Sequence, residues 1–315
     1  MGRSCVVLTH IETFIHSCRK SPTQIYFRDS DDNGKALEDM FDNIHVHKPT
    51  SVTGTNMLSA QQVNHFEAFG FLLLRELYSP EEMAELSREV AVLMETQPAK
   101  SDGPDFWSLA PFIEHSTTLI DLPVDDRIYQ PMEQLLGNGF TWGGSEGVSG
   151  SFNETNDHQW HSDRGGQIDL SYRRIKIMIY LQSMRKETGA LRVIPGSHHA
   201  PFHTMLLPLQ EQKQDTSAGV FGAAGGDLPC TTLEVDPGDV VVFDHYLFHA
   251  VYGKQEMRRY VALKFAAKPE TEVHYEALRA HRQDASTLHE SLRHSEHPRV
   301  KGMVEGLLHW ETKLG

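Results

Sequence analysis

A histidine and an aspartate two residues apart are the side chains of this sequence whose types and spacing best suit metal binding. They belong to the segment His161-Ser162-Asp163. On an extended segment, alternate side chains project to the same face, so the imidazole and the carboxylate can reach one ion. The sequence contains 19 histidines, and about one His-x-Asp match is then expected by chance. The pair alone is therefore also compatible with a surface histidine beside a solvated aspartate.

A third candidate ligand lies well downstream, after a strongly apolar run. Residues 240–243 are Val-Val-Val-Phe and predict a buried strand, and His249 follows at its far end. His245 is an alternative, because unbroken period-two alternation gives it the same facing as His249. Two imidazoles and one carboxylate form a facial set on an octahedral ion and leave its other positions open for substrate and O2. Such a set suits Fe(II).

The residues that would position these ligands belong to a β-rich region. From 139 to 268, short runs of strand-forming residues alternate with Gly, Pro, Asp and Asn. The runs lie at roughly 140–153, 168–182, 190–195, 231–235, 239–243 and 257–266. Short strands separated by turn residues predict a jelly roll, a double-stranded β-helix barrel, rather than alternating strand–helix units. The fold class is therefore mainly β with flanking helices.

The run near residue 175 has two distinct faces. Aliphatic side chains at 175, 177, 179 and 181 alternate with Lys176, Met178, Tyr180 and Gln182. We expect the aliphatic face to pack in the core and the opposite face to line a polar cavity.

Helices flank the β-rich region on both sides. Ser59 and Gln62 form a capping box that predicts a helix over about 60–69, and Phe71 to Leu74 then predicts a buried strand. Ser79, followed by Pro and two Glu, opens a second helix with one apolar face. The tail from about 270 to 312 returns to helical spacing.

A single domain over 1–315 accommodates all of these elements. It comprises a helical N-terminal flank with some strands over 1–138, the β core over 139–268 and a helical C-terminal flank over 269–315. Residues 1–56 are mixed in character and indicate no role. The stretch 206–230 is rich in Gly and Ala and predicts a mobile lid, although an ordinary surface insertion has the same composition.

The overall charge excludes some classes of partner. With 43 acidic and 29 basic residues, a formal charge of -14 offers no field for phosphate backbones or anionic lipid, so we expect no nucleic acid and no membrane partner. No apolar run approaches the ~20 residues that a membrane span needs. Cys5, Cys18 and Cys230 are widely spread, which favours neither disulfides nor a thiolate zinc site. A reducing, cytoplasmic location is expected, and the sequence does not define an oligomeric state.

Several motifs in a fixed order resemble the phytanoyl-CoA dioxygenase-like family of Fe(II)/2-oxoglutarate oxygenases. The resemblance spans about 62 to 268. Each motif is weak by itself, and their order and spacing together are specific. The motifs are Phe66–Phe71, Ser79–Glu82, Trp160–Asp163, Gly189–His198, Gly238–Phe243, His249 and Arg258.

The resemblance implies an iron site and a reaction. The family's iron ligands correspond by position to His161, Asp163 and His249. This correspondence favours His249 over His245 as the third ligand. The cosubstrates are 2-oxoglutarate and O2, and the products include succinate and CO2. The carboxylate of Asp163 disfavours halogenation, because related halogenases have a small residue there.

The resemblance also implies a site for the far carboxylate of 2-oxoglutarate. Arg258 is expected to bind it, because the planar guanidinium can hold a carboxylate with two hydrogen bonds. Its neighbour Arg259 alternates with apolar residues that look like a packing face. Val251 stands where the family often has a serine that helps to hold this carboxylate. Lys176 and Tyr180 are the candidates for the second contact, although a lysine at a barrel rim is also common.

The expected reaction is the hydroxylation of a C–H bond of a small organic substrate. The same cofactors also serve desaturation, cyclisation and epimerisation, which the sequence does not distinguish. A non-catalytic cupin-like binding module is a further alternative, against which Arg258 argues. The acidic chain shows no basic rim for the phosphates of a CoA thioester, so a free amino acid, a small acid or a secondary metabolite is favoured.

Two further segments lie near the expected site in sequence. Arg164, followed by two glycines, is as compatible with a solvated loop residue as with a contact to an anionic substrate. Residues 195–198 predict a turn that closes a hairpin, and we place His198 outside the site.

Overall fold

The structure is a computed structural model that describes residues 57–98, 106–150, 158–163, 169–211, 219–253, 257–281 and 288–314. These residues belong to one compact unit, Lys48–Gly315. The expectations about residues 1–56 and about Arg164 fall outside the described ranges. The assignment of 1–315 to a single domain stays a prediction for the same reason.

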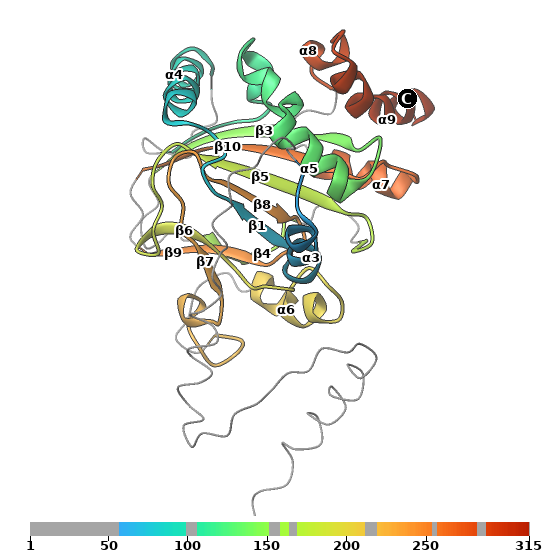
Figure 1. Cartoon of the computed structure of the whole chain (residues 1–315). Helices are drawn as coiled ribbons and strands as arrows, with labels where there is room; N and C mark the ends of the chain where they lie inside the picture. Colours follow the sequence, from blue (N-terminus) through green and yellow to red (C-terminus); the bar gives the residue numbers. More distant parts are fainter. Residues whose placement is uncertain are drawn as a thin grey trace, which may run out of the picture. The chain divides into compact units, whose positions relative to one another are not determined.

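Two antiparallel sheets form the centre of the described fold (Figure 1). The larger has the order β1-β8-β5-β10-β3-β2 and the smaller the order β4-β9-β6-β7. This is a jelly-roll architecture, as predicted, although the described strands remain two sheets and do not join into one closed barrel. The strands are β1 (Phe71–Leu74), β2 (Phe106–Leu109), β3 (Thr141–Gly150), β4 (His158–His161), β5 (Arg174–Tyr180), β6 (Thr188–Val193), β7 (Thr231–Leu233), β8 (Val240–Asp244), β9 (His249–Gly253) and β10 (Arg258–Ala266).

The strand predictions were correct for every long apolar run and missed three short strands. The predicted runs correspond to β3, β5, β6, β7, β8 and β10. The missed strands are β2, β4 and β9, which are four or five residues long and lack an extended apolar pattern. His249 follows the apolar run of β8, as expected, but it lies on a different strand. The chain turns after Asp244, and His249 begins β9 in the other sheet.

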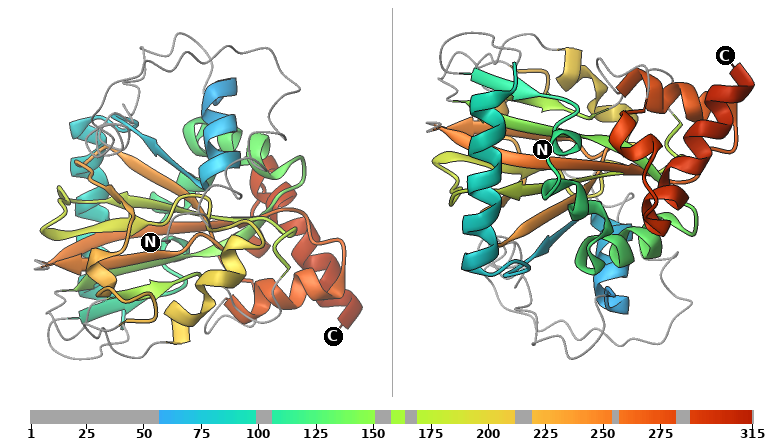
Figure 2. Two further views of the ribbon diagram at one scale, coloured as in Figure 1. Left: turned by 90° about the horizontal axis from the view of Figure 1, so that it is seen from below. Right: turned by 90° about the horizontal axis from the view of Figure 1, so that it is seen from above.

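Helices cover the outer face of the larger sheet (Figure 2). The α-helices are α3 (Ala60–Phe69), α4 (Pro80–Thr96), α5 (Asp126–Leu136), α6 (Phe202–Glu211), α7 (Glu272–His281), α8 (Glu290–Arg293) and α9 (Pro298–Leu314). The 3-10 helices are η1 (Ile113–His115), η2 (Leu119–Val124) and η3 (Gly225–Asp227). The predicted capping box is present at Ser59, and the predicted capping residue Ser79 forms a second one with Glu82. Gly70 ends α3 in the left-handed conformation, which glycine adopts without steric cost.

Three apolar clusters separate the layers. The largest lies between the helices and the outer face of the larger sheet, where α4, α5 and α9 pack on side chains such as Ile177 and Leu263. A second lies between the two sheets and includes Met178 and Val251. A third joins α6 to the outer face of the smaller sheet. The two-faced character predicted for 175–182 is therefore confirmed.

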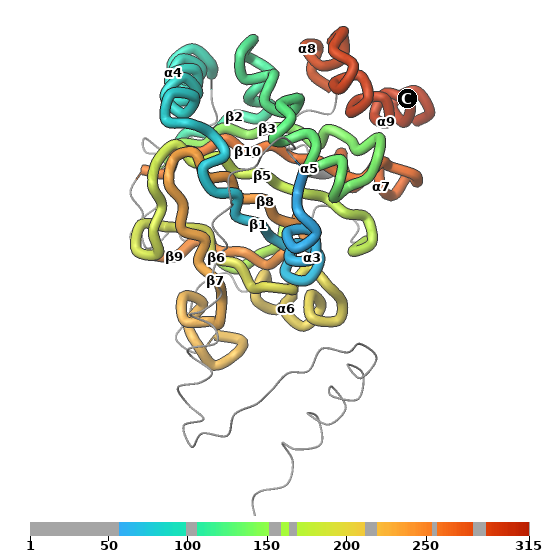
Figure 3. Tube along the Cα trace, in the orientation of Figure 1, coloured from blue at the N-terminus to red at the C-terminus, as the bar shows by residue number. Residues whose placement is uncertain are grey.

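Part of the predicted lid is helical. Residues 202–211 form α6, and its Leu206 and Leu209 are buried in the third cluster. The tube in Figure 3 shows α6 next to the smaller sheet. Residues 206–211 of the predicted lid are therefore part of a helix, whose buried side chains recur every three residues, at 203, 206 and 209. Residues 212–218 lie outside the described ranges. Among the described helices, none is both long and apolar enough to cross a membrane.

Candidate active site

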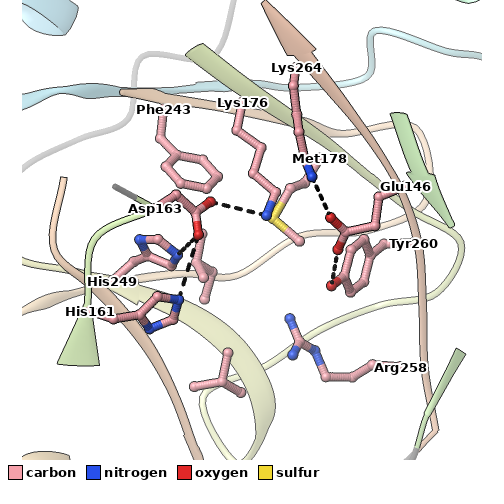
Figure 4. A pocket seen from close by; sticks show the side chains of 12 residues that line it. Glu146, His161, Asp163, Lys176, Met178, Phe243, His249, Arg258, Tyr260 and Lys264 are labelled. Atoms are coloured by element: carbon pink, nitrogen blue, oxygen red, sulfur yellow. Dashed lines mark hydrogen bonds and ion pairs between the residues drawn. The ribbon is translucent and has the colours of Figure 1, made fainter. Parts of the chain in front are cut away.

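The smaller sheet brings the three predicted metal ligands together. His161 ends β4 and His249 begins β9, and these two residues are register partners on adjacent strands. Asp163 follows β4, and its Oδ1 lies 3.7 Å from Nε2 of His161 and 3.8 Å from Nε2 of His249. One candidate ligand atom from each residue lies within 4.8 Å of the other two. The three side chains therefore converge on one point (Figure 4).

Backbone carbonyls orient both imidazole rings. Nδ1 of His161 lies 2.7 Å from the carbonyl oxygen of Gln159, and Nδ1 of His249 lies 2.9 Å from that of Leu247. A protonated Nδ1 donates to such an oxygen and leaves Nε2 as the lone-pair donor for a metal. Burial, followed by the nearby His161, lowers the pKa of His249 to about 3. His249 is therefore a neutral imidazole at neutral pH, which is the form that binds metals.

The two oxygens of Asp163 face different partners. Oδ1 faces the histidines, whereas Oδ2 accepts a hydrogen bond of 3.1 Å from Nζ of Lys176. Burial by itself would lower the pKa of Lys176, but the carboxylates of Asp163 and Glu146 outweigh burial and raise it well above its ordinary value. The lysine is therefore a permanent cation that fixes the orientation of the carboxylate.

Helix α6 holds the segment between the two ligands of the His-x-Asp pair. Ser162 is buried, and both its backbone N–H and its hydroxyl donate to Oε1 of Gln210 at 3.3 Å. The amide of Gln210 in turn donates to the carbonyl of Ser162. Because Leu206 and Leu209 anchor α6 in the core, this contact ties His161 and Asp163 to a fixed element.

The turn between β8 and β9 decides which downstream histidine joins the site. The backbone N–H of Tyr246 donates to the carboxylate of Asp244 at 2.8 Å, and that of Phe248 donates to the hydroxyl of Ser197 at 2.7 Å. This turn interrupts the period-two alternation. His245 is buried away from the cavity, whereas His249 faces His161 and lines it.

A cavity of about 220 Å³ extends from the three ligands between the two sheets. Its described lining consists of Glu146, His161, Asp163, Lys176, Met178, Leu191, Phe243, His249, Val251, Arg258, Tyr260 and Lys264. Val251 lines it as an apolar residue. The position at which the family often has serine therefore offers no hydrogen bond here.

Arg258 reaches this cavity, and its neighbour does not. The Arg258 side chain is buried at 2 % exposure and lines the cavity, whereas Arg259 is exposed. The Arg258 guanidinium carbon lies 5.8 Å from the ring centre of Tyr180 and 5.5 Å from that of Tyr260. One of its nitrogens donates to the Tyr180 hydroxyl at 3.3 Å. Tyr180 does not line the cavity itself, and its hydroxyl helps to hold the Arg258 guanidinium in place by accepting this hydrogen bond.

The sequence analysis missed Glu146, Tyr260 and Lys264. The period-two alternation that places Arg258 on the inner face of β10 also places Tyr260 and Lys264 there. The sequence pattern therefore contained the information needed to predict these two residues as part of the site. Glu146 lies on β3, and the glycine- and serine-rich sequence around it gave no such signal. Lys264 donates to Glu146 at 2.8 Å, and the hydroxyl of Tyr260 donates to the same carboxylate at 3.3 Å.

Glu146 stays ionised although the cavity partly shields it from water. Burial by itself would raise its pKa, but the ammonium groups of Lys264 and Lys176 outweigh it and lower the pKa to about 2. Among the described lining residues, Lys176, Lys264 and Arg258 then oppose two carboxylates. The cavity therefore carries one excess positive charge before any ligand binds.

Known proteins resemble this chain in sequence and in fold. Ectoine dioxygenase from Bordetella bronchiseptica is 29% identical over 215 residues, which are 61% of this chain and 69% of that protein. HygX from Streptomyces hygroscopicus, solved with nickel and 2-oxoglutarate bound, is 20% identical with a TM-score of 0.56, over 69% of this chain and 90% of that chain. The epimerase SnoN from nogalamycin biosynthesis is 16% identical with a TM-score of 0.52, over 66% of this chain and 82% of that chain.

The family model named phytanoyl-CoA dioxygenase (PhyH) matches residues 66–259, which is more than half of the chain. This range contains all three converging ligands, Arg258 and most of the described strands. The chain therefore belongs to the phytanoyl-CoA dioxygenase family of iron- and 2-oxoglutarate-dependent oxygenases.

Proposed function

We propose that this protein binds Fe(II) through His161, Asp163 and His249 and uses 2-oxoglutarate and O2 to hydroxylate a C–H bond of a small organic molecule. The observation that carries the proposal is the convergence of these three donors, within 4.8 Å, at one side of a cavity that also contains Arg258. Membership of the phytanoyl-CoA dioxygenase family supports the choice of iron and 2-oxoglutarate.

The donor set fits Fe(II). Two imidazoles and one carboxylate are ligands of intermediate and hard character, which suits a non-heme ferrous ion. All three come from the side of the smaller sheet, because His161 and His249 lie on adjacent strands and Asp163 follows the first of them. The side of the ion that faces the larger sheet would therefore be open to exchangeable ligands.

Arg258 would hold the far carboxylate of 2-oxoglutarate. Its guanidinium lies beside two adjacent tyrosine rings in a buried part of the cavity, where a charged hydrogen bond is stronger than in water. Tyr180, one candidate for the second contact, does not line the cavity, and we propose that its hydroxyl, which accepts a hydrogen bond from Arg258, holds the guanidinium in position. Lys176 was the other candidate, but its observed partner is Asp163, and we propose that it orients this carboxylate.

When bound, iron and 2-oxoglutarate supply the activation of O2, with release of succinate and CO2. The protein contributes position and shielding from water. Lys176 holds Oδ2 of Asp163, so that Oδ1 is presented to the ion. Phe243, Met178 and Leu191 provide apolar lining that limits access of water.

The outcome of the oxidation separates the remaining alternatives. Desaturation, cyclisation and epimerisation would use the same residues, and hydroxylation is proposed because this chain resembles ectoine dioxygenase in sequence. A hydroxylated product is heavier than the substrate by one oxygen atom, whereas a desaturated product is lighter by two hydrogen atoms. A cupin-like binding module without turnover would yield no succinate with any substrate.

The test is a screen of small organic molecules with Fe(II), 2-oxoglutarate and O2, in which succinate formation is measured and the product mass is determined. We expect succinate release to rise with one class of substrate, and we expect His161→Ala and Asp163→Ala to abolish this coupled turnover. Lys301→Met, on an exposed part of α9, is the control for handling and folding. Retained turnover in both ligand variants would contradict the assignment of the iron site.

A further inference from the structure

Two lysines lie side by side on the wall of the cavity that faces the iron ligands. Lys176 on β5 and Lys264 on β10 are register partners in the larger sheet, and both line the cavity. They are buried, with 9% and 7% exposure. Among the described residues, the ammonium of Lys176 bonds to Asp163 and that of Lys264 to Glu146. An ammonium has three donors, so each lysine has hydrogen-bonding capacity beyond its protein partner.

The Lys264–Glu146 pair has no evident role in binding the cosubstrate. Lys264 and Arg258 are six positions apart on β10, which separates their backbones by roughly 20 Å at ~3.3 Å per residue. In Figure 4, Tyr260 is drawn between Glu146 and Arg258. Buried ion pairs also contribute little net stability, because desolvation offsets their attraction. A purely structural role is therefore a weak explanation for a charged pair in a cavity wall.

Binding of iron would reduce the negative charge that is available to neutralise the two lysines. Asp163 is the partner of Lys176, and its charge would be shared with a dication once the metal is bound. Fe(II) and doubly negative 2-oxoglutarate cancel each other, so the one excess positive charge of the described lining would persist. Glu146 alone would then face two neighbouring ammonium groups.

We propose that Lys264 and Lys176 form a binding site for a carboxylate of the primary substrate, which makes the substrate a small organic acid or amino acid. This inference rests on the proposed function and deepens it. A monocarboxylate would neutralise the excess charge and accept charge-assisted hydrogen bonds from both lysines. Glu146, which Tyr260 also contacts, competes for one of the Lys264 donors and leaves the others for the substrate. The carboxylate would thus fix the substrate on the side of the cavity toward which the iron is open.

Binding of a simple carboxylate tests the site without knowledge of the substrate. The probe is trifluoroacetate, whose binding is measured by fluorine NMR. The full-length protein is loaded with Zn(II) and saturating 2-oxoglutarate, and trifluoroethanol serves as the uncharged control compound. We expect the wild type to bind trifluoroacetate and not trifluoroethanol. Lys264→Met should weaken this binding at least tenfold, whereas Glu146→Gln should tighten it because the competing carboxylate is lost. Lys301→Met is the matched control at an exposed lysine.

Two outcomes of the binding experiment would overturn the proposal. Equal binding by the wild type and by both cavity variants would show that the pair has no part in holding a carboxylate. Binding of trifluoroacetate that disappears when 2-oxoglutarate is added would assign the lysines to the cosubstrate instead. Because the two variants have opposite expected effects, a folding defect in one of them leaves the other decisive.

Turnover gives a second, independent readout. Pairs of small acids and their carboxamides are offered with Fe(II), 2-oxoglutarate and O2, and we expect turnover only with the acids. Lys264→Met should raise the KM for the acid by a factor at least ten times larger than the factor by which it raises the KM for 2-oxoglutarate. Equal turnover of acids and amides would overturn the carboxylate site while leaving the proposed function intact. If the wild type formed no succinate under any condition, the proposed function itself would fail.

Discussion

At the scale of single residues, the site depends on which neighbour of a pair faces the cavity. Arg258 and Arg259 are adjacent in the chain, yet only Arg258 is buried in the cavity wall. His245 and His249 are equally compatible with simple alternation, yet only His249 meets the other two ligands. In each pair, the residue outside the cavity can therefore serve as the control for mutation of the residue that lines it. The two members have the same residue type and lie in the same region, and they differ in orientation.

The two arginines give the sharpest test of cosubstrate binding. Arg258→Met should raise the KM for 2-oxoglutarate by roughly ten- to a hundredfold, because a hydrogen bond to a charged group contributes about 1.5–3 kcal/mol. Arg259→Met should leave this KM unchanged, because its side chain is exposed. Steady-state kinetics with varied 2-oxoglutarate measures both constants. An equal rise in both variants would contradict the assignment of Arg258.

At the scale of elements, the turn between β8 and β9 is decisive, because it carries the chain from the larger sheet to the smaller one and delivers His249. Asp244 ends β8, and its carboxylate accepts the backbone N–H of Tyr246 inside this turn. Burial raises the pKa of Asp244 from 3.8 to about 6, although Tyr246 and the arginines at 173 and 174 act in the opposite direction. The turn therefore contains a group that titrates in the weakly acidic range.

This titration predicts how stability depends on pH. The carboxyl of Asp244 stays protonated in the fold to a higher pH than in the unfolded chain. Its contribution to stability is thus fully present below about pH 4 and is lost as the pH rises through about 6, by up to about 3 kcal/mol. Asp244→Asn keeps a neutral side chain, so the variant should gain stability relative to the wild type as the pH rises from 4 to 7. Chemical denaturation at several pH values measures this difference, and parallel curves would refute the prediction.

At the scale of the whole molecule, the iron site lies on the smaller sheet, while the cavity it faces is completed by the larger one. Ligands bound there contact both layers of the fold. A ligand that binds only the folded protein stabilises it by about 2.7 kcal/mol at a hundred times its dissociation constant. Metal binding should therefore be visible in the stability of the entire described unit.

Thermal unfolding with Co(II) provides this measurement. We expect Co(II) to raise the Tm of the wild type by several degrees, since 1 kcal/mol shifts the Tm of a domain of this size by ~2–4 °C. His249→Ala should lose the shift, whereas His245→Ala should keep it relative to its own metal-free Tm. The reverse result, with the shift lost only in His245→Ala, would exchange the roles of the two histidines.

The sequence by itself indicated the longer elements and several residues of the candidate site, because the patterns that indicate them are local. Capping boxes at Ser59 and Ser79 and the apolar runs of the long strands need no distant partner to be recognised. The order of the motifs likewise indicated the family before any contact was known. The pattern also placed Lys176 and Met178 on one face of β5, and both line the cavity.

Only the tertiary structure decided which of these residues meet. The turn after Asp244 breaks the alternation, so the choice between His245 and His249 depended on a crossing between sheets rather than on the period of a strand. Lys176 was a candidate contact to the carboxylate of 2-oxoglutarate, and in the structure its ammonium donates a hydrogen bond to Asp163. Glu146 was not predicted as a site residue. The contact of Glu146 with Lys264 follows from strand register, since β3 pairs with β10. The contact of Lys176 with Asp163 instead joins the larger sheet to the segment that follows β4. Register brings together side chains more than a hundred residues apart, and the local pattern of a single strand contains no information about its partner.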